Sequence, residues 1–91
     1  MPTAEAEITI LNRNGLHARP AMQLVDTASQ FSSEVRVHKG GQAVDAKSIM
    51  QVLMLAATHG AVLKVSADGD DADAAVAAVR ALVATRFGED G

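Results

Sequence analysis

Alternating apolar and polar side chains predict a first strand close to the N-terminus. From Glu5 to Leu11 the pattern has a period of two, which is typical of a strand with one buried face. Stretches with similar alternation or with many β-branched residues predict three more strands, at 34–38, 42–45 and 61–67. Asn14-Gly15 and Gly40-Gly41 interrupt the apolar pattern, and turns are expected at both places.

Apolar residues recur at helical spacing in the segments between these strands. The spacing predicts helices over 18–30, 49–57 and 71–86. Pro20 falls in the first turn of the first helix, where its missing N–H costs nothing. Ser48 is the expected N-cap of the second helix, and Gly60 is the residue expected to end it. Residues 88–91 are expected to form a frayed tail.

The resulting order, β-α-β-β-α-β-α, is expected to form one domain over residues 1–91. Because the strands carry one apolar face, we expect an α+β fold whose helices cover one side of a sheet. The pattern leaves the order of the strands in the sheet open. A ferredoxin-like sheet with an extra helix is therefore an alternative fold.

Composition argues against several classes of function. The chain has no Cys, which excludes disulfides, thiolate chemistry and Cys-based metal sites. It has no Trp or Tyr, and its net charge is -3, so neither single-stranded nucleic acid nor duplex DNA is an expected partner. Glu5 and Glu7 stand where a signal peptide would be basic and then apolar, and no apolar run is long enough to span a bilayer. We expect a soluble cytoplasmic protein without membrane insertion.

The stretch from Gly15 to Ala21 is the strongest candidate for chemistry. His17 is expected at the N-cap of the first helix, where the helix dipole favours anions and disfavours a cationic imidazole. Arg19 follows in the first turn and offers a planar set of donors that suits phosphate oxygens. This combination suits a phosphoryl group on a histidine nitrogen. The alternative interpretation is a polar cap beside a solvated arginine.

The other histidines and the aspartate cluster are expected to be structural. His38 is interpreted as a solvated strand residue, and His59 as a residue near the C-terminal dipole of the second helix. Capping and dipole compensation explain the aspartates before the last helix, which lack the spacing of a calcium loop: Asp68, Asp70, Asp71 and Asp73. No metal site and no cofactor are expected.

Two motifs together resemble those of the HPr family, the histidine-containing phosphocarriers of the bacterial phosphoenolpyruvate-dependent phosphotransferase system. The run from Gly15 to Ala21 is similar to the family's active-site signature, and Ala46 to Met50 is similar to its regulatory serine motif. The two motifs have the family's separation and lie in the family's order of elements. The resemblance implies an open-faced β-sandwich, in which a four-stranded antiparallel sheet carries three helices on one face.

The resemblance also implies a function. His17 would accept a phosphoryl group on Nδ1 from phosphorylated Enzyme I and pass it to a histidine of an Enzyme IIA protein or domain, for sugar transport or its regulation. Arg19 matches the phosphate-stabilising residue, and Ser48 matches the serine that HPr kinase/phosphorylase modifies. The protein would then be a carrier that forms a phosphohistidine rather than an enzyme, and a monomer is expected.

The surroundings of Ser48 are expected to dock partners. Lys47 precedes this serine, and the apolar residues that follow form the expected contact patch: Ile49, Met50 and Leu53. A phosphate on Ser48 would add about -1.5 to -2 charges there and repel an acidic partner. Since His17 and Ser48 each open a helix, their positions can lie at the same end of the domain, within reach of one partner.

Some positions depart from the sugar-transport branch of the family. Asp26, Ser29 and Gln51 stand in the area where that branch often carries lysines. The acidic tail at 87–90 and the Leu53-Met54-Leu55 run look more like nitrogen-branch relatives of the NPr type. The first interpretation is a general phosphocarrier, and the second is a nitrogen-branch regulatory carrier. A small ferredoxin-like binding module without phosphotransfer is the alternative from another class.

Overall fold

Four strands and three helices follow one another in the expected order. The computed structural model describes residues 2–89. Its elements are β1 (Thr3–Thr9), α1 (Ala18–Ala28), β2 (Glu34–Lys39), β3 (Gln42–Asp45), α2 (Ile49–Met54), β4 (Val62–Asp68) and α3 (Ala72–Ala84), followed by a single 3₁₀ turn, η1 (Arg86–Gly88).

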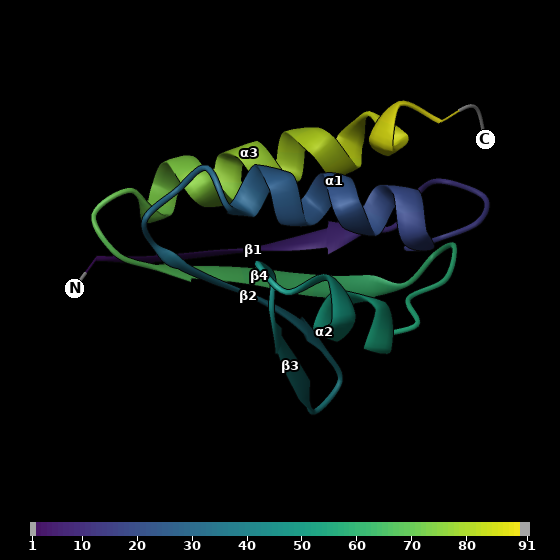
Figure 1. Cartoon of the computed structure of the whole chain (residues 1–91), viewed down its shortest axis with the longest axis horizontal. Coiled ribbons are helices and arrows are strands. Elements are labelled where there is room, and N and C mark those ends of the chain that lie inside the picture. Colours follow the sequence, from purple (N-terminus) through teal and green to yellow (C-terminus); the bar gives the residue numbers. More distant parts are fainter. Residues whose placement is uncertain (1, 90–91) are drawn as a thin grey trace.

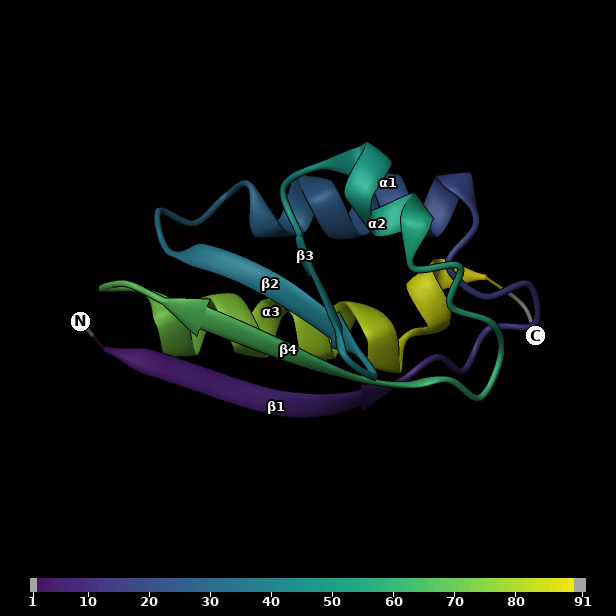
Figure 2. The same ribbon diagram turned by 90° about the horizontal axis from the view of Figure 1, so that it is seen from below.

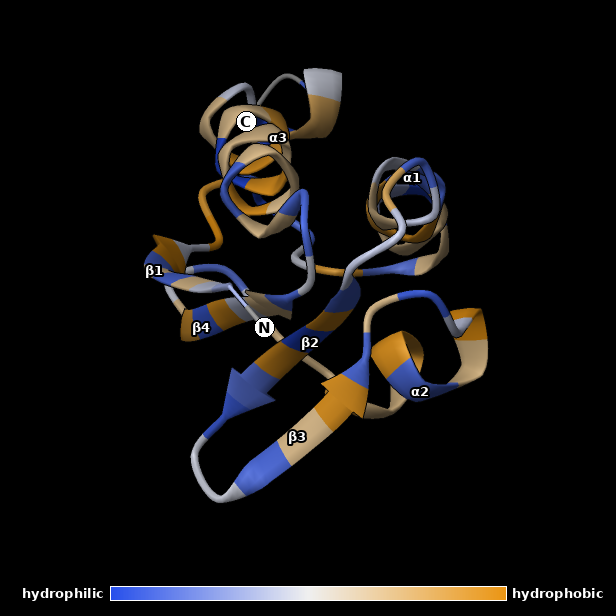
Figure 3. Ribbon diagram, turned by 90° about the vertical axis from the view of Figure 1, so that its left-hand side faces the viewer, coloured by the Kyte–Doolittle hydropathy of each residue, from blue (hydrophilic) through white to orange (hydrophobic). Residues whose placement is uncertain are grey.

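The strands form one antiparallel sheet in the order β1-β4-β2-β3, so β4 lies between β1 and β2. The helices cover one face of this sheet, and the other face is left open (Figure 1). Figure 3 shows the same layers seen along α1 and α3. The expected open-faced α+β fold is confirmed. The structure also gives the order of the strands in the sheet, which the sequence pattern had left open.

The core lies between the sheet and the helices because side chains on a strand alternate between the two faces. Val35, Val37 and Val65 point inward and are fully buried on neighbouring strands. Leu24 of α1 and Val79 of α3 close this core from the helical side. Most residues between the buried ones are polar, such as Glu34, Arg36 and Lys64, so the outer face of the sheet is mainly hydrophilic.

The ends of most elements differ from the expectation by up to three residues; α1, for example, ends at Ala28 rather than at residue 30, and α3 covers Ala72–Ala84 rather than 71–86. The first strand runs from Thr3 to Thr9 rather than from Glu5 to Leu11. Ile10 is buried but continues the chain outside the ladder, where its N–H donates to the Ala61 carbonyl and its carbonyl accepts from Gly60 N–H.

The second helix ends at Met54 rather than at residue 57. Ala56 leaves the helix with a φ of 49°, in the left-handed conformation that Gly60 was expected to supply. Gly60 instead lies in the turn before β4. His59 is therefore five residues beyond the helix and does not interact with its dipole as expected.

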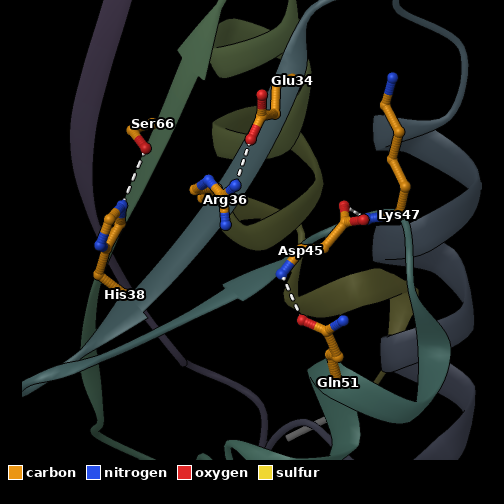
Figure 4. Close-up of polar contacts among 7 residues, drawn as sticks. All are labelled: Glu34, Arg36, His38, Asp45, Lys47, Gln51 and Ser66. Carbon is orange, nitrogen blue, oxygen red and sulfur yellow. Dashed lines mark hydrogen bonds and ion pairs between the residues drawn. The ribbon is translucent and has the colours of Figure 1, made fainter.

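Polar residues on the open face of the sheet pair both across strands and along one strand (Figure 4). The Nε2 atom of His38 lies 2.9 Å from the Ser66 hydroxyl, and Arg36 pairs with Glu34 on the same strand. His38 is half-buried. His38 thus lies on the surface of the sheet, as expected, but it is only partly exposed and its ring contacts Ser66.

Asp71 opens α3, but its carboxylate does not cap that helix. It accepts hydrogen bonds from the backbone N–H groups of Ser32 and Ser33, each at 2.9 Å, and from the Ser33 hydroxyl. The Ser33 hydroxyl, followed by the Ser32 N–H, lowers the pKa of Asp71 to about 2. The expected capping role is thus replaced by a tie between the start of α3 and the loop that leads into β2.

Candidate functional site

His17 lies where the sequence places it, at the N-cap of α1. Its backbone is extended, with φ -75° and ψ -174°, and its carbonyl accepts the first helical hydrogen bond from Ala21 N–H at 3.0 Å. The side chain makes no capping bond and is 40% exposed. Pro20 is buried in the first turn, as expected. The imidazole thus lies partly exposed at the positive end of the helix dipole.

The loop before His17 is tied to the segment that follows α2. Leu16 N–H donates to the Ala57 carbonyl at 2.9 Å. Gly15 has a φ of +67°, and a Cβ there would come within 2.8 Å of the Thr58 Cα. The side chain of Asn12 is fully buried and donates to the Gly15 carbonyl at 2.7 Å. These contacts fix the backbone that presents the histidine.

A carboxylate that the sequence analysis missed contacts His17. Glu89 Oε2 lies 2.9 Å from His17 Nε2, and Glu89 Oε1 accepts from Asn12 Nδ2 at 3.0 Å. The Glu89 side chain is only 17% exposed. The expectation of a frayed tail is therefore wrong for Gly88 and Glu89, whereas residues 90–91 lie outside the described part of the chain.

Phe87 explains why the C-terminal segment stays on the domain. Its side chain is 2% exposed, and it belongs to the hydrophobic core. The end of α3 and the loop before α1 lie at the same end of the molecule, so a short turn carries Glu89 to His17 (Figure 1). A large aromatic residue in an otherwise polar tail was the signal in the sequence that this segment packs.

Basic side chains lie around this end of the molecule. Arg19 is exposed, and no hydrogen bond or ion pair joins its side chain to another residue within 2–89. Arg13 and Arg86 line a hollow of about 300 Å³ together with His59 and Leu11. Arginine side chains in this position are available for an anion or for an acidic surface.

Ser48 caps α2 as expected. Its hydroxyl accepts from Gln51 N–H at 3.4 Å. The Gln51 side chain reaches back to accept from Asp45 N–H at 3.0 Å, and the Asp45 carboxylate accepts from Lys47 N–H at 2.9 Å (Figure 4). The Lys47 ammonium donates to the Phe31 carbonyl at 2.7 Å. Lys47 therefore ties the loop after α1 to the start of α2.

The expected apolar patch is present on α1 and α2, although its residues differ in exposure. Met50 is 70% exposed, and Leu53 is also exposed. Ile49 is half-buried against the core and lines a groove with Met22, Val25 and Asp26. Two exposed methionines, Met22 and Met54, extend the patch. This methionine patch thus comprises Met22, Ile49, Met50, Leu53 and Met54. Flexible, polarizable methionines suit a surface that adapts to more than one partner.

The two helix starts do not lie at the same end of the domain. α1 and α2 run in opposite directions, so the end of α2 approaches the start of α1 (Figure 2). Ile49, directly after Ser48, lines a groove with Met22, Val25 and Asp26 in the middle of α1, and Lys47, directly before Ser48, reaches the Phe31 carbonyl beyond the end of α1. The expectation that the two helix starts share one end of the domain is therefore corrected.

No cluster of three or more metal-ligating side chains was found among residues 2–89. Within the same residues, none of the helices has the length and apolar character needed to cross a membrane.

Comparison with known proteins places this arrangement in a family. The family model for the PTS HPr component phosphorylation site matches residues 4–85. The phosphocarrier protein HPr of Cupriavidus necator is 46% identical over 85 residues, which cover 93% of this chain and 96% of the relative.

Solved structures agree with this assignment. A crystal structure of HPr-C-His from Thermoanaerobacter tengcongensis has a TM-score of 0.93 and 46% identity, and covers 97% of this chain and 99% of that chain. A structure described as an HPr dimer from the same organism has a TM-score of 0.78 and 49% identity, with 90% and 94% covered. The chain therefore belongs to the HPr family, the phosphoryl carriers of the bacterial phosphotransferase system.

Proposed function

We propose that His17 accepts a phosphoryl group from phosphorylated Enzyme I and donates it to a histidine of an Enzyme IIA protein or domain. The observation that carries this proposal is the half-exposed imidazole at the N-cap of α1, inside the segment that the family model matches. In each step a nitrogen–phosphorus bond forms on the acceptor as the one on the donor breaks. The carrier supplies position and electrostatics for this exchange.

Arg19 and the free N–H groups of the first turn of α1 are the anion-binding part of the site. Helix N-termini bind anions because their first N–H groups lack helical partners and the dipole is positive there. Arg19 is free to turn its guanidinium toward the phosphoryl oxygens, since it is exposed and engaged by no described residue. We propose that it stabilises the phosphoryl group during transfer.

The test is phosphorylation with Enzyme I and phosphoenolpyruvate, followed by intact mass before and after mild acid. We expect one acid-labile phosphate on the wild type and none on His17→Ala. His59→Ala is the matched control, because His59 is an exposed histidine that lies in a turn and does not cap a helix. The His59→Ala variant should take up the same phosphate as the wild type. Labelling that persists in His17→Ala would refute the assignment.

A second candidate is a nitrogen-branch regulatory carrier, favoured by the acidic and neutral residues beside the patch. Asp26 lines the groove with Ile49, and Gln51 is bound to Asp45. These side chains offer less positive charge to an acidic partner than lysines would. Transfer from the phosphorylated protein to purified sugar-type and nitrogen-type Enzyme IIA proteins distinguishes the branches by rate.

Ser48 is proposed as a regulatory site. The serine caps the start of α2, where HPr kinase/phosphorylase could reach the hydroxyl.

The protein is proposed to act as a monomer. A homologous structure is described as a dimer, so the oligomeric state is tested directly. Sedimentation at several concentrations should give a single species of monomer mass, whereas a mass that doubles with concentration would contradict the monomer.

A further inference from the structure

The contact between Glu89 and His17 joins residues from opposite ends of the described chain. One carboxylate serves two partners, with Oε1 on the Asn12 amide and Oε2 on His17 Nε2. Asn12 in turn uses its other amide hydrogen on the Gly15 carbonyl. The glutamate is thereby fixed to the same loop that presents the histidine, which is more than an incidental surface pair requires.

We propose that Glu89 is a positioning residue that holds the His17 imidazole with its hydrogen on Nε2, so that Nδ1 presents a lone pair to the incoming phosphoryl group. This inference rests on the proposed phosphocarrier function. An ionised carboxylate only accepts hydrogen bonds, so a neutral imidazole facing it at 2.9 Å must donate from Nε2. A partner on one ring nitrogen thus fixes the chemical state of the other.

The transfer step balances with this arrangement. The Nδ1 lone pair forms the new nitrogen–phosphorus bond, and the electrons of the broken bond return to the nitrogen of the donor histidine. The Nε2 hydrogen stays on the His17 ring, which becomes cationic beside the Glu89 carboxylate. A cationic ring is a better leaving group than a neutral one, so the same carboxylate supports the onward transfer.

The backbone that carries Glu89 is strained. Arg86 and Phe87 both have a φ of 56°, and Gly88 has a φ of 74°, so three successive residues are left-handed. This conformation is unfavourable for residues other than glycine, because the Cβ comes too close to the following carbonyl oxygen. Burial of Phe87 and the hydrogen bond from Glu89 N–H to the Arg86 carbonyl at 2.9 Å hold it in place. Strain that surrounding contacts maintain is typical of functional sites.

The direct test is the ¹⁵N NMR spectrum of the unphosphorylated protein at about pH 9, well above the ordinary pKa of histidine of about 6.5. In the wild type we expect Nε2 of His17 to give the shift of a protonated ring nitrogen and Nδ1 that of an unprotonated one. Glu89→Ala should move both shifts toward the average of a mixture of tautomers. Glu89→Gln, which keeps an acceptor without the charge, should lie between the two.

The second readout is the initial rate of phosphorylation by Enzyme I. Losing a hydrogen bond to a charged group should slow Glu89→Ala about tenfold, and Glu89→Gln less. Glu7→Gln is the matched control, because it removes an exposed carboxylate from β1, and its rate should equal that of the wild type. Thermal melts of all variants show whether the domain stays folded.

The outcomes separate this inference from the proposed function. If the wild type takes up no acid-labile phosphate, the phosphocarrier proposal fails, and the NMR shifts still decide whether Glu89 sets the tautomer. If the wild type is phosphorylated but Glu89→Ala leaves the His17 shifts unchanged, Glu89 does not position the ring and the inference is overturned. A folded Glu89→Ala variant with the wild-type rate would overturn it as well.

Discussion

Gly15 shows how a single residue without a side chain shapes the site. Its φ of +67° is a conformation that residues with a Cβ rarely adopt, and the backbone of Ala57 and Thr58 occupies the space where a Cβ would lie. Neither neighbour can move aside easily, because Leu16 N–H is bonded to the Ala57 carbonyl. The close approach of these two segments is what places His17 at the start of α1.

Gly15→Ala should therefore lower the free energy of unfolding by clearly more than about 1 kcal/mol, through strain and overlap together. A loss of that size lowers the melting temperature by about 4–8 °C per kcal/mol in a domain of this length. The matched control is Gly40→Ala, where φ is +59° but no atom lies within 4 Å of the added Cβ. Equal melting temperatures for the two variants would show that the close approach does not constrain the loop.

Arg19 has a more specific expected role than the glycine. Arg19→Ala should slow transfer through His17 by about ten- to a hundred-fold, because it removes a hydrogen bond to a charged group in the transition state. Arg19→Lys should restore part of that loss, since a lysine keeps the charge without the planar fork. Stopped-flow or rapid-quench transfer from Enzyme I measures the rates, with Arg80→Ala on the exposed side of α3 as the control. Unchanged kinetics in Arg19→Ala would remove it from the site.

At the scale of elements, the Asp71 carboxylate joins the start of α3 to the loop before β2. The pKa of this group falls from 3.8 to about 2 on account of the Ser33 hydroxyl and the Ser32 N–H. A carboxyl whose pKa is lowered in the folded state contributes stability that is present above its unfolded pKa and lost as the pH falls through the folded value. The contribution of Asp71 is thus complete above about pH 4 and disappears toward about pH 2.

Asp71→Asn should therefore be less stable than the wild type at neutral pH, and the gap should close between about pH 4 and pH 2. Urea unfolding at a series of pH values measures this difference directly. Asp73→Asn is the control, because Asp73 is exposed in the first turn of α3. The difference in stability between Asp73→Asn and the wild type should not change between about pH 4 and pH 2. A constant difference between Asp71→Asn and the wild type across this range would contradict the assignment.

The elements themselves were largely predictable, because periodicity reports which face of a strand or helix is buried. The ends of the elements were less so. α2 stops because Ala56 adopts a left-handed conformation, and alanine gives no signal of that in the sequence. His17, Arg19 and Ser48 were found through local motifs, whereas Glu89 was missed because its contact with His17 spans nearly the whole chain. Periodicity carries no information about such a contact, and only the aromatic Phe87 hinted at it.

At the scale of the whole molecule, α1 and α2 run in opposite directions, which separates the proposed regulatory position at Ser48 from the proposed phosphoryl site at His17. Ser48→Asp adds a charge beside the methionine patch but away from His17, and aspartate caps helices as well as serine does. We expect an unchanged melting temperature and a several-fold lower second-order rate of transfer from Enzyme I. The maximal rate should stay the same, because the site at the start of α1 is untouched.

Salt provides the check on this electrostatic explanation. Exposed charges are screened over about 10 Å at 0.1 M ionic strength, so the difference between Ser48→Asp and the wild type should shrink as salt rises. Ser48→Asn keeps the cap without the charge and should behave as the wild type at every salt concentration. A Ser48→Asp variant that melts normally and accepts phosphate at the wild-type rate in low salt would leave Ser48 as a helix cap alone.

The central place of β4 in the sheet has a consequence for the order in which a ribosome makes this protein. β1 and β2 are synthesised first, yet each pairs with β4 and not with the other. The nascent chain therefore carries two strands with open edges until Val62–Asp68 has left the exit tunnel. His17 is made before β4, but its neighbour Glu89 follows β4 in the sequence. Completion of the sheet and of the contact between Glu89 and His17 thus both wait for the segment from β4 onward.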